Sequence, residues 1–301
     1  MVIAIALSEL SSILVLGVTN GAIYSLVAIG LVLVYKASGV FNFAQGEFGT
    51  VAIYGAYATF SIFHLPYGLG LVLGLAGAVA MGLLTERLVI RPLFDAPRVT
   101  LLVATAGVAL LAIGVQFWRT ANSPLKYLDS IVNSSGSLDR VSPFGVAVSD
   151  QKLITLFVLV VAAVLLFLFF RSPLGLAVLA ASQEPVASEL VGVSVKRVST
   201  ITWGLAALLG GAAGLLYAGG SQFSPGVITA AVLIPGFTAA IVGGITSLPG
   251  AAAGGILIGI LQALGGLSTF ESIKGASFVS VFVVLLVVLL VRPQGLFASR
   301  S

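Results

Sequence analysis

Residues 198–270 read VSTITWGLAALLGGAAGLLYAGGSQFSPGVITAAVLIPGFTAAIVGGITSLPGAAAGGILIGILQALGGLSTF and contain no charged side chain and no histidine. A helix needs about 20 apolar residues to cross a bilayer, so this stretch is long enough for several crossings. Turn signals at 219–221 and 247–250 divide it. The stretch therefore predicts three membrane-spanning helices, near 199–218, 227–246 and 251–270.

The remainder of the chain has the same character. Of the 301 residues, 59% are hydrophobic and only 8% are charged, whereas a soluble domain carries about 25% charged residues. The mean hydropathy is +1.18, and the alternation typical of β-barrel strands is absent. Further apolar stretches are Leu10–Tyr35, Phe48–Phe63, Leu65–Thr85, Val99–Trp118, Leu153–Phe170 and 275–291. We therefore predict an all-α polytopic integral membrane protein, a single bundle of about 8–9 transmembrane helices over residues 1–301.

Composition also excludes several classes of function. The chain has no cysteine and a single histidine, His64, so disulfides and thiolate nucleophiles are impossible and a histidine metal site is not expected. No G-x-x-x-x-G-K-[ST] motif and no pair of catalytic carboxylates occurs, so ATP binding through a P-loop is excluded. We expect no catalytic site, no metal and no cofactor on this chain. The net charge of +4 records topology, and no nucleic-acid partner is expected.

The distribution of Lys and Arg predicts the topology. Basic residues are more numerous in the loops 86–98 and 171–197 and in the C-terminal tail than on the opposite side, where most lie in the long loop 119–152. The positive-inside rule then puts the C-terminus in the cytoplasm and the N-terminus outside. The outer loop is either a small cap or a plain connector, with SLDRV (137–141) and FGVAV (144–148) as candidate short strands. Trp118 and Trp203 lie near predicted span ends, where aromatic rings act as interface anchors.

Polar residues interrupt the apolar pattern at Asn42–Glu47. An acid at or below the bilayer boundary, such as Glu47, is costly unless paired or hydrated, which marks it as a functional candidate. Asn42 and Gln45 lie one helical turn apart, so they either line a polar path or hydrogen-bond an unwound backbone. The alternative is an ordinary loop with a solvated acid near Lys36.

A second irregularity is expected at Pro235 and Gly236, inside the predicted span 227–246. Proline removes a backbone hydrogen bond and glycine adds freedom, so we predict a broken or kinked helix there. Broken helices in two halves of a carrier often mark its transport pathway. The candidate pathway residues are Asn42, Gln45, Glu47, Pro235 and Gly236. A simple packing kink is the alternative.

The inner loop 171–197 is long for a connector. We predict that Ser182 caps a short helix over 183–191, which ends at Gly192. Val186, Leu190 and Val191 would form its apolar face, which either the membrane surface or another protein must cover. Elsewhere, glycines spaced four residues apart indicate close helix packing; they include Gly17 and Gly21, and Gly255 and Gly259.

Three blocks of sequence resemble one known family. Residues Gly17–Tyr57 are similar to the first helices of the LivH-type branched-chain amino acid ABC permeases, whose N-[FM]-A-[QH]-G-E signature stands here as Asn42–Glu47. Phe237–Gly244 resembles a second block, and Arg292–Phe297, RPQGLF, resembles the C-terminal one. The order of the blocks, the length and the predicted span count agree over the whole chain.

This resemblance implies a permease of the bacterial or archaeal cytoplasmic membrane that imports branched-chain or related amino acids. Its implied partners are a related second permease, two cytoplasmic ATPases that bind ATP and Mg²⁺, and an extracytoplasmic binding protein. Residues 187–192 are similar to the family's A-A-x-x-x-G coupling loop, although Ser188 replaces the second alanine and Val186 stands where an acid is common. The coupling residues would be Glu184, Ala187, Ser188, Glu189, Leu190 and Gly192.

Two alternatives remain at this point. Relatives of the family serve urea and amides, so another small polar solute is an alternative substrate. An ion-coupled secondary carrier is the alternative mechanism, although it would need acidic, basic or histidine side chains deep in the spans, and residues 198–270 contain none.

Overall fold

The computed structural model describes residues 2–120, 125–130, 140–141, 147–267, 275–292 and 294–297. Its α-helices are α1 (Val2–Ser38), α2 (Gln45–Tyr57), α3 (Tyr67–Thr85), α4 (Arg98–Thr120), α5 (Asp150–Arg171), α6 (Pro173–Gln183), α7 (Pro185–Leu190), α8 (Val195–Ala218), α9 (Ile234–Gly243), α10 (Leu248–Leu264) and α11 (Ala276–Val291). Three π-helical turns and one 3₁₀ turn extend them: η1 (Ala58–Ile62), η2 (Glu86–Ile90), η4 (Thr229–Leu233) and η3 (Arg91–Leu93). The chain is an all-α polytopic membrane bundle, as predicted.

Four short strands lie at one end of the bundle. β1 (Lys126–Leu128) pairs antiparallel with β4 (Ser221–Phe223), and β2 (Arg140–Val141) pairs antiparallel with β3 (Ala147–Val148). β2 and β3 fall within the two segments predicted as strands, and much of the loop between them lies outside the described residues. The β1–β4 pair joins the described part of the outer loop to the connection after α8, which argues for a cap.

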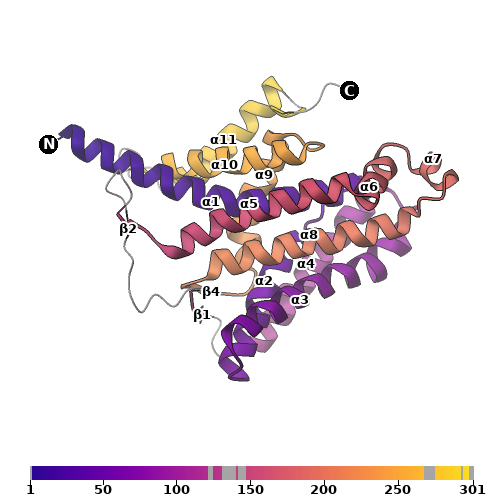
Figure 1. The fold of residues 1–301 in the computed structure, drawn as a ribbon, viewed down its shortest axis with the longest axis horizontal. Helices are drawn as coiled ribbons and strands as arrows, with labels where there is room; N and C mark the ends of the chain where they lie inside the picture. Colours follow the sequence, from indigo (N-terminus) through magenta and orange to yellow (C-terminus); the bar gives the residue numbers. More distant parts are fainter. Residues whose placement is uncertain are drawn as a thin grey trace.

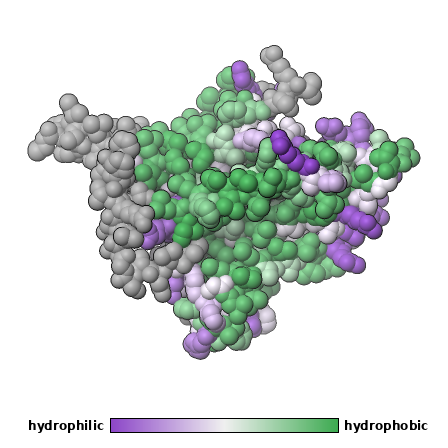
Figure 2. Space-filling model, in the orientation of Figure 1, coloured by the Kyte–Doolittle hydropathy of each residue, from purple (hydrophilic) through white to green (hydrophobic). Residues whose placement is uncertain are grey.

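The long helices run side by side, with the N-terminus and the strands at one end and α6 and α7 at the other (Figure 1). Five described helices are long and apolar enough to cross a membrane by length and composition: α1, α3 with its extension to Leu93, α4, α5 and α8. Shorter apolar helices are α6, the continuous segment Thr229–Gly243, α10 and α11. Hydrophobic residues cover most of the flank in view, and hydrophilic ones gather toward the α7 end (Figure 2).

Helix α1 forms the centre of the bundle. Every residue from 21 to 34 is buried, and 72% of its most apolar window is covered by the rest of the chain. The corresponding share for α5 is only 11%, so α5 presents most of its surface outward. A helix that is apolar all round and fully surrounded belongs in a core, and one that is apolar but uncovered faces lipid or another subunit.

Close backbone contact holds α1 against α10. A Cβ added to Gly21 would lie 2.7 Å from the Cα of Ile256, and one added to Gly17 would lie 2.7 Å from the Cα of Ile260. Gly255 and Gly259 of α10 meet Ser25 and Gly21 of α1 in the same way. The glycines at four-residue spacing therefore do pack two helices, as their pattern predicts.

Three expectations from the sequence are wrong in detail. The helical segment 229–243 is not broken at Pro235, but it is irregular there, because the π-turn η4 runs directly into α9; of the two predicted forms, a break is wrong and a distorted helix is what the structure has. The chain turns instead at Gly244, whose φ is 106°. Ser182 caps no helix but lies in the last turn of α6, and α7 starts after Glu184, which makes no side-chain cap bond.

Trp203 is the third correction. It is a core residue that is 1% exposed, rather than an interface anchor. Its ring packs edge-on against Phe48, with centroids 6.5 Å apart. Trp118, by contrast, is 76% exposed. Both residues lie near span ends in the sequence, so position along a span does not distinguish an anchor from a residue that faces the neighbouring helix.

The α1–α10 contact predicts opposite effects of one substitution at two glycines. Gly21→Ala adds a methyl group against backbone that cannot move aside, which costs about 1–3 kcal/mol. Gly107→Ala on α4 adds the same methyl group where no atom lies within 4 Å, so only the helix preference of alanine, up to about 1 kcal/mol, remains. Thermal unfolding of the purified protein should show a lower midpoint for Gly21→Ala and an equal or higher one for Gly107→Ala. Equal midpoints for the two variants would contradict this packing.

Candidate functional site

The segment between α1 and α2 carries the first set of polar residues. Helix α1 ends at Ser38, and Gly39, with φ at 67°, lets the chain turn. The Oδ1 of Asn42 accepts a hydrogen bond from the N–H of Ala44 at 3.0 Å, and its Nδ2 donates to Oε1 of Gln45 at 3.4 Å. Asn42 thus supplies an acceptor at the start of α2, where helix N–H groups lack partners.

Gln45 connects this start of α2 to α8. Its Nε2 donates to the carbonyl oxygen of Ala206 at 2.9 Å, and the side chain is fully buried. The N–H of Phe43 in the unwound segment donates to Oγ1 of Thr105 on α4 at 3.1 Å. The interruption at 42–47 is therefore a helix junction whose backbone and amide groups are bonded within the protein.

Glu47 lies at the centre of a buried polar cluster that we call the Glu47 junction, made of Glu47, Gln116, Thr229 and Gly226. One carboxylate oxygen accepts from Oγ1 of Thr229 at 2.6 Å, and the other accepts from Nε2 of Gln116 at 2.7 Å. The Oε1 of Gln116 in turn accepts from the N–H of Gly226 at 2.9 Å. Glu47 is 0% exposed. The junction joins α2, α4 and η4 through hydrogen bonds that stabilise a buried carboxylate.

Gln116 and Thr229 were not among the residues expected from the sequence. Gln116 is a polar amide inside the apolar stretch Val99–Trp118, which is itself a signal of a functional or pairing role in a membrane span. Thr229 carries no such signal, because threonine often bonds to its own helix backbone.

Pro235 and Gly236 are buried as well. A Cβ on Gly236 would lie 2.8 Å from Cγ1 of Val27, so this position lets α9 approach α1. The next residue, Phe237, packs against the rings of Phe41 and Phe43 at centroid distances of 4.8 and 6.1 Å. The structure thus brings the two irregular segments together through aromatic contact, and their role in a transport pathway stays a prediction.

Helix α7 carries the second set of candidate residues. It projects from the end of the bundle beyond α6 (Figure 1), and its apolar side chains Val186, Leu190 and Val191 are 73%, 85% and 79% exposed. Glu184, Ala187 and Glu189 are exposed too, whereas Ser188 is buried. Gly192 follows the helix with φ at 88°, a conformation that favours glycine.

A second buried cluster anchors the base of this projecting segment. Glu86 is 0% exposed and forms a salt bridge with Arg91 at 2.9 Å. The Nη2 of Arg91 also donates to Oγ1 of Thr200 at 2.7 Å. Thr200 lies in α8, directly after the inner loop, so these bonds fix the start of α8 to the end of the α3 segment. In the sequence Arg91 contributes only to the charge distribution that predicts topology, and no local pattern pairs it with Glu86 or Thr200.

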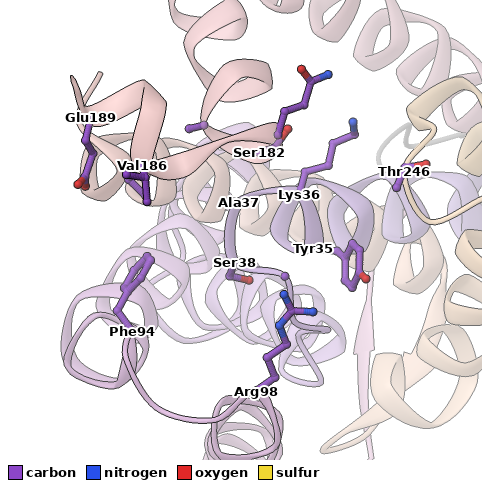
Figure 3. Close-up of a pocket in the computed structure, with 14 residues that line it drawn as sticks. Tyr35, Lys36, Ala37, Ser38, Phe94, Arg98, Ser182, Val186, Glu189 and Thr246 are labelled. Atoms are coloured by element: carbon purple, nitrogen blue, oxygen red, sulfur yellow. The ribbon is translucent and has the colours of Figure 1, made fainter. Parts of the chain in front are cut away.

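Two cavities adjoin α1, one at its C-terminal end and one beside its middle, and they are called inner and outer after the predicted topology. An inner cavity of about 750 Å³ is lined by Lys36, Ser38, Arg98, Ser182, Glu189 and Thr246, among others (Figure 3). An outer cavity of about 360 Å³ is lined by Thr19, Asn20, Gln151, Lys152 and Tyr217, among others. The buried residues 24–34 of α1 lie between them. None of Asn42, Gln45, Glu47, Pro235 and Gly236 lines either cavity.

Comparison with known proteins agrees with these features. Residues 13–291 match the family described as branched-chain amino acid transport system / permease component. The chain is 31% identical to the high-affinity branched-chain amino acid transport system permease protein LivH of Escherichia coli (strain K12), over 93% of this chain and 92% of that one. It is 31% identical to BraD of Pseudomonas aeruginosa, a permease protein of the same description, over 94% of both chains.

More distant matches extend the comparison. A probable branched-chain amino acid transport permease protein LivH of Methanocaldococcus jannaschii is 30% identical, over 79% of this chain and 76% of that one. Among solved structures, PsaBC from Streptococcus pneumoniae in complex with Fab aligns at 15% identity with a TM-score of 0.49, over 93% and 91% of the two chains. The match over residues 13–291 and the relatives at about 31% identity give one conclusion: this multi-pass membrane protein belongs to the branched-chain amino acid transport permease family.

Proposed function

We propose that this chain is the transmembrane permease subunit of an ATP-binding cassette importer for branched-chain amino acids in the cytoplasmic membrane. The names of its relatives support the substrate class. The structural observation that carries the mechanism is α7, a short helix at one end of the bundle with its apolar face exposed. An exposed apolar helix face of that kind marks a binding surface for a partner. An ATPase would bury this face and would supply the free energy of ATP hydrolysis for transport.

The partners follow from what the chain lacks and from where its surfaces lie. Two ATPases would bind ATP and Mg²⁺ and dock on α7 in the cytoplasm, and an external binding protein would deliver the amino acid. The α7 end and the C-terminus are then cytoplasmic and the N-terminus is outside, in agreement with the distribution of Lys and Arg.

A related second permease completes the proposal. The inner cavity adjoins residues 35–39 and the outer cavity residues 16–23, and the buried residues 24–34 of α1 separate them. A path beside α1 within this chain would require that segment to separate from α10, against which it packs backbone to backbone. A path between two permease subunits requires no such separation, so we place the route for substrate at the interface of this chain with its partner.

The signature residues act in this proposal by holding the helices of the pathway wall in place. Asn42, Gln45 and Glu47, together with Pro235 and Gly236, fix how α2, α4, α8 and α9 cross in the wall of the pathway. Rigid crossings allow closure of the ATPases at α7 to tilt the bundle as a unit and so change which side is open. Glu47 should be the most sensitive of these residues to substitution, since each of its carboxylate oxygens accepts a hydrogen bond from a different helix.

Reconstitution tests the proposed function directly. We expect proteoliposomes with both permeases, the ATPases and the binding protein to take up labelled leucine when ATP is present on the cytoplasmic side. The chain alone should take up none, with or without an ion gradient. Gradient-driven uptake by the chain alone would contradict the mechanism, and uptake of amides without leucine by the full assembly would contradict the substrate class.

Charge on the α7 surface should uncouple the transporter. Ala187→Asp or Gly192→Glu places a carboxylate in an apolar docking surface, and loss of such a contact costs about 2 kcal/mol or more, roughly a 30-fold loss of affinity. ATPase subunits should no longer copurify with these variants and leucine uptake should be lost, while the permease still inserts in the membrane. Gln222→Glu adds the same charge to an exposed residue at the strand end of the bundle and should keep the ATPases bound. Normal leucine uptake by both α7 variants would show that α7 is not the docking surface.

The Glu47 junction makes a separate prediction. Glu47→Ala leaves the Gln116 amide and the Thr229 hydroxyl without their acceptor in a buried site, at about 1–3 kcal/mol for each orphaned group. The thermal midpoint of the purified assembly and leucine uptake should fall together, and Glu47→Gln, which retains one acceptor, should lose less. Asp95→Ala removes an exposed acid and serves as the control. A Glu47→Gln variant with unchanged stability but no transport would indicate direct contact with substrate instead of a positioning role.

A further inference from the structure

A third cavity adjoins the inner one and differs from it in character. This apolar groove, of about 590 Å³, lies between α1, α5, α6 and the turn that leads into α10. Most of its lining is hydrocarbon, from side chains that include Ile29, Leu166, Phe167, Phe170, Leu179 and Leu248. Lys36 and Thr246 line both the groove and the inner cavity. The two spaces therefore meet at Lys36, with an apolar space on one side and a polar opening on the other.

The ammonium group of Lys36 has no partner within the described part of the chain. The only salt bridge there joins Arg91 to Glu86, and no hydrogen bond from Lys36 is formed to another described residue. The side chain is half-buried. A half-buried cation at the inner end of a membrane helix needs an anion or water, and the apolar groove beside it offers neither.

One other cation lines the same opening. Arg98 lines the inner cavity, with its Cζ 3.6 Å from the place that a Cβ of Gly39 would take, and it too makes no ion pair among the described residues. Figure 3 shows Lys36, Arg98 and Ser182 around this opening, with Glu189, the one acid in its lining, at the far side on α7. The guanidinium of Arg171 lies 4.3 Å from the centroid of the Phe167 ring, but Arg171 lines neither cavity.

We propose that these adjoining cavities bind one anionic phospholipid. An acyl chain lies in the groove between α1 and α5, and the phosphate of the headgroup lies against Lys36, in the cavity that Thr246 also lines. Cationic pockets between helices at the inner membrane surface attract such headgroups. Because α5 is so little covered by the rest of the chain, the groove opens toward the bilayer, and hydrocarbon fills it better than a free phosphate ion would.

The site has a consequence for the segment that carries α7. Ser182 lies in the last turn of α6, three residues before α7 starts. A headgroup at Lys36 of α1 lies in the cavity that Ser182 of α6 also lines, and so lies between the core helix and the base of α7. The bound lipid then holds α7 at a fixed distance from the bundle.

Native mass spectrometry of the assembled transporter, taken from nanodiscs that contain equal amounts of phosphatidylglycerol and phosphatidylcholine, tests this site. We expect the wild type to retain one phosphatidylglycerol for each copy of this chain. Lys36→Gln should lower that occupancy about five-fold, the effect expected of one cation at a membrane surface, and Lys36→Arg should restore it. Ala163→Phe, which fills the groove from an exposed position of α5, should lower retention of the lipid with every charge left in place.

Arg87→Gln is the matched control, because it removes an exposed cation at the same end of the bundle and outside both cavities. Its phosphatidylglycerol occupancy should equal that of the wild type. Displacement of the lipid signal by inorganic phosphate, with Ala163→Phe without effect, would identify a free-anion site and overturn the proposal. Retention of both lipids equally would overturn it too, as would a crosslink from an Ala163→Cys variant to the second permease, which would show protein in the groove.

Discussion

Nothing in a bilayer pulls two apolar helices together by exclusion of water, so the fold depends on how closely their backbones can approach. The contact between α1 and α10 meets this constraint. Gly17 and Gly21 on one helix face Gly255 and Gly259 on the other, and no side chain stands between them. The same principle recurs where Gly74 of α3 meets the backbone of α2 and where Gly214 of α8 meets Gly49. Van der Waals contact along these lines replaces the hydrophobic effect that would organise a soluble core.

The second constraint is that polar groups inside the bundle must find partners within the protein. The Glu47 junction and the Glu86 cluster solve this problem at two places. One joins α2, α4 and η4, and the other joins the end of the α3 segment to the start of α8. Since ion pairs and buried hydrogen bonds have strict geometry, they specify one arrangement among helices that glycine contacts alone would leave free to slide.

The sequence was sufficient for the class of fold, for the approximate spans and for the interruption at Asn42–Glu47, because these depend on local composition and length. It was not sufficient for what the polar residues touch. The partners of Glu47 are 69 and 182 residues away along the chain, and no local pattern encodes such distances. Pro235 shows a related limit: a proline inside an apolar span predicts an irregular helix, but local composition does not show that the irregularity is a π-turn, η4, directly before α9. Trp203 faces the neighbouring helix rather than the interface, which depends on the rotation of α8 and not on its length.

The Glu47 junction also limits how the chain can change during evolution. A carboxylate that draws one donor from α4 and another from η4 ties three distant positions into a single unit. A substitution at 47, 116 or 229 alone leaves a buried polar group at another of these positions without its hydrogen-bond partner. Single substitutions are therefore selected against, even where a set of several would be stable. These positions are therefore expected to be inherited together, and a lineage that departs from glutamate at 47 should carry compensating residues at the other two.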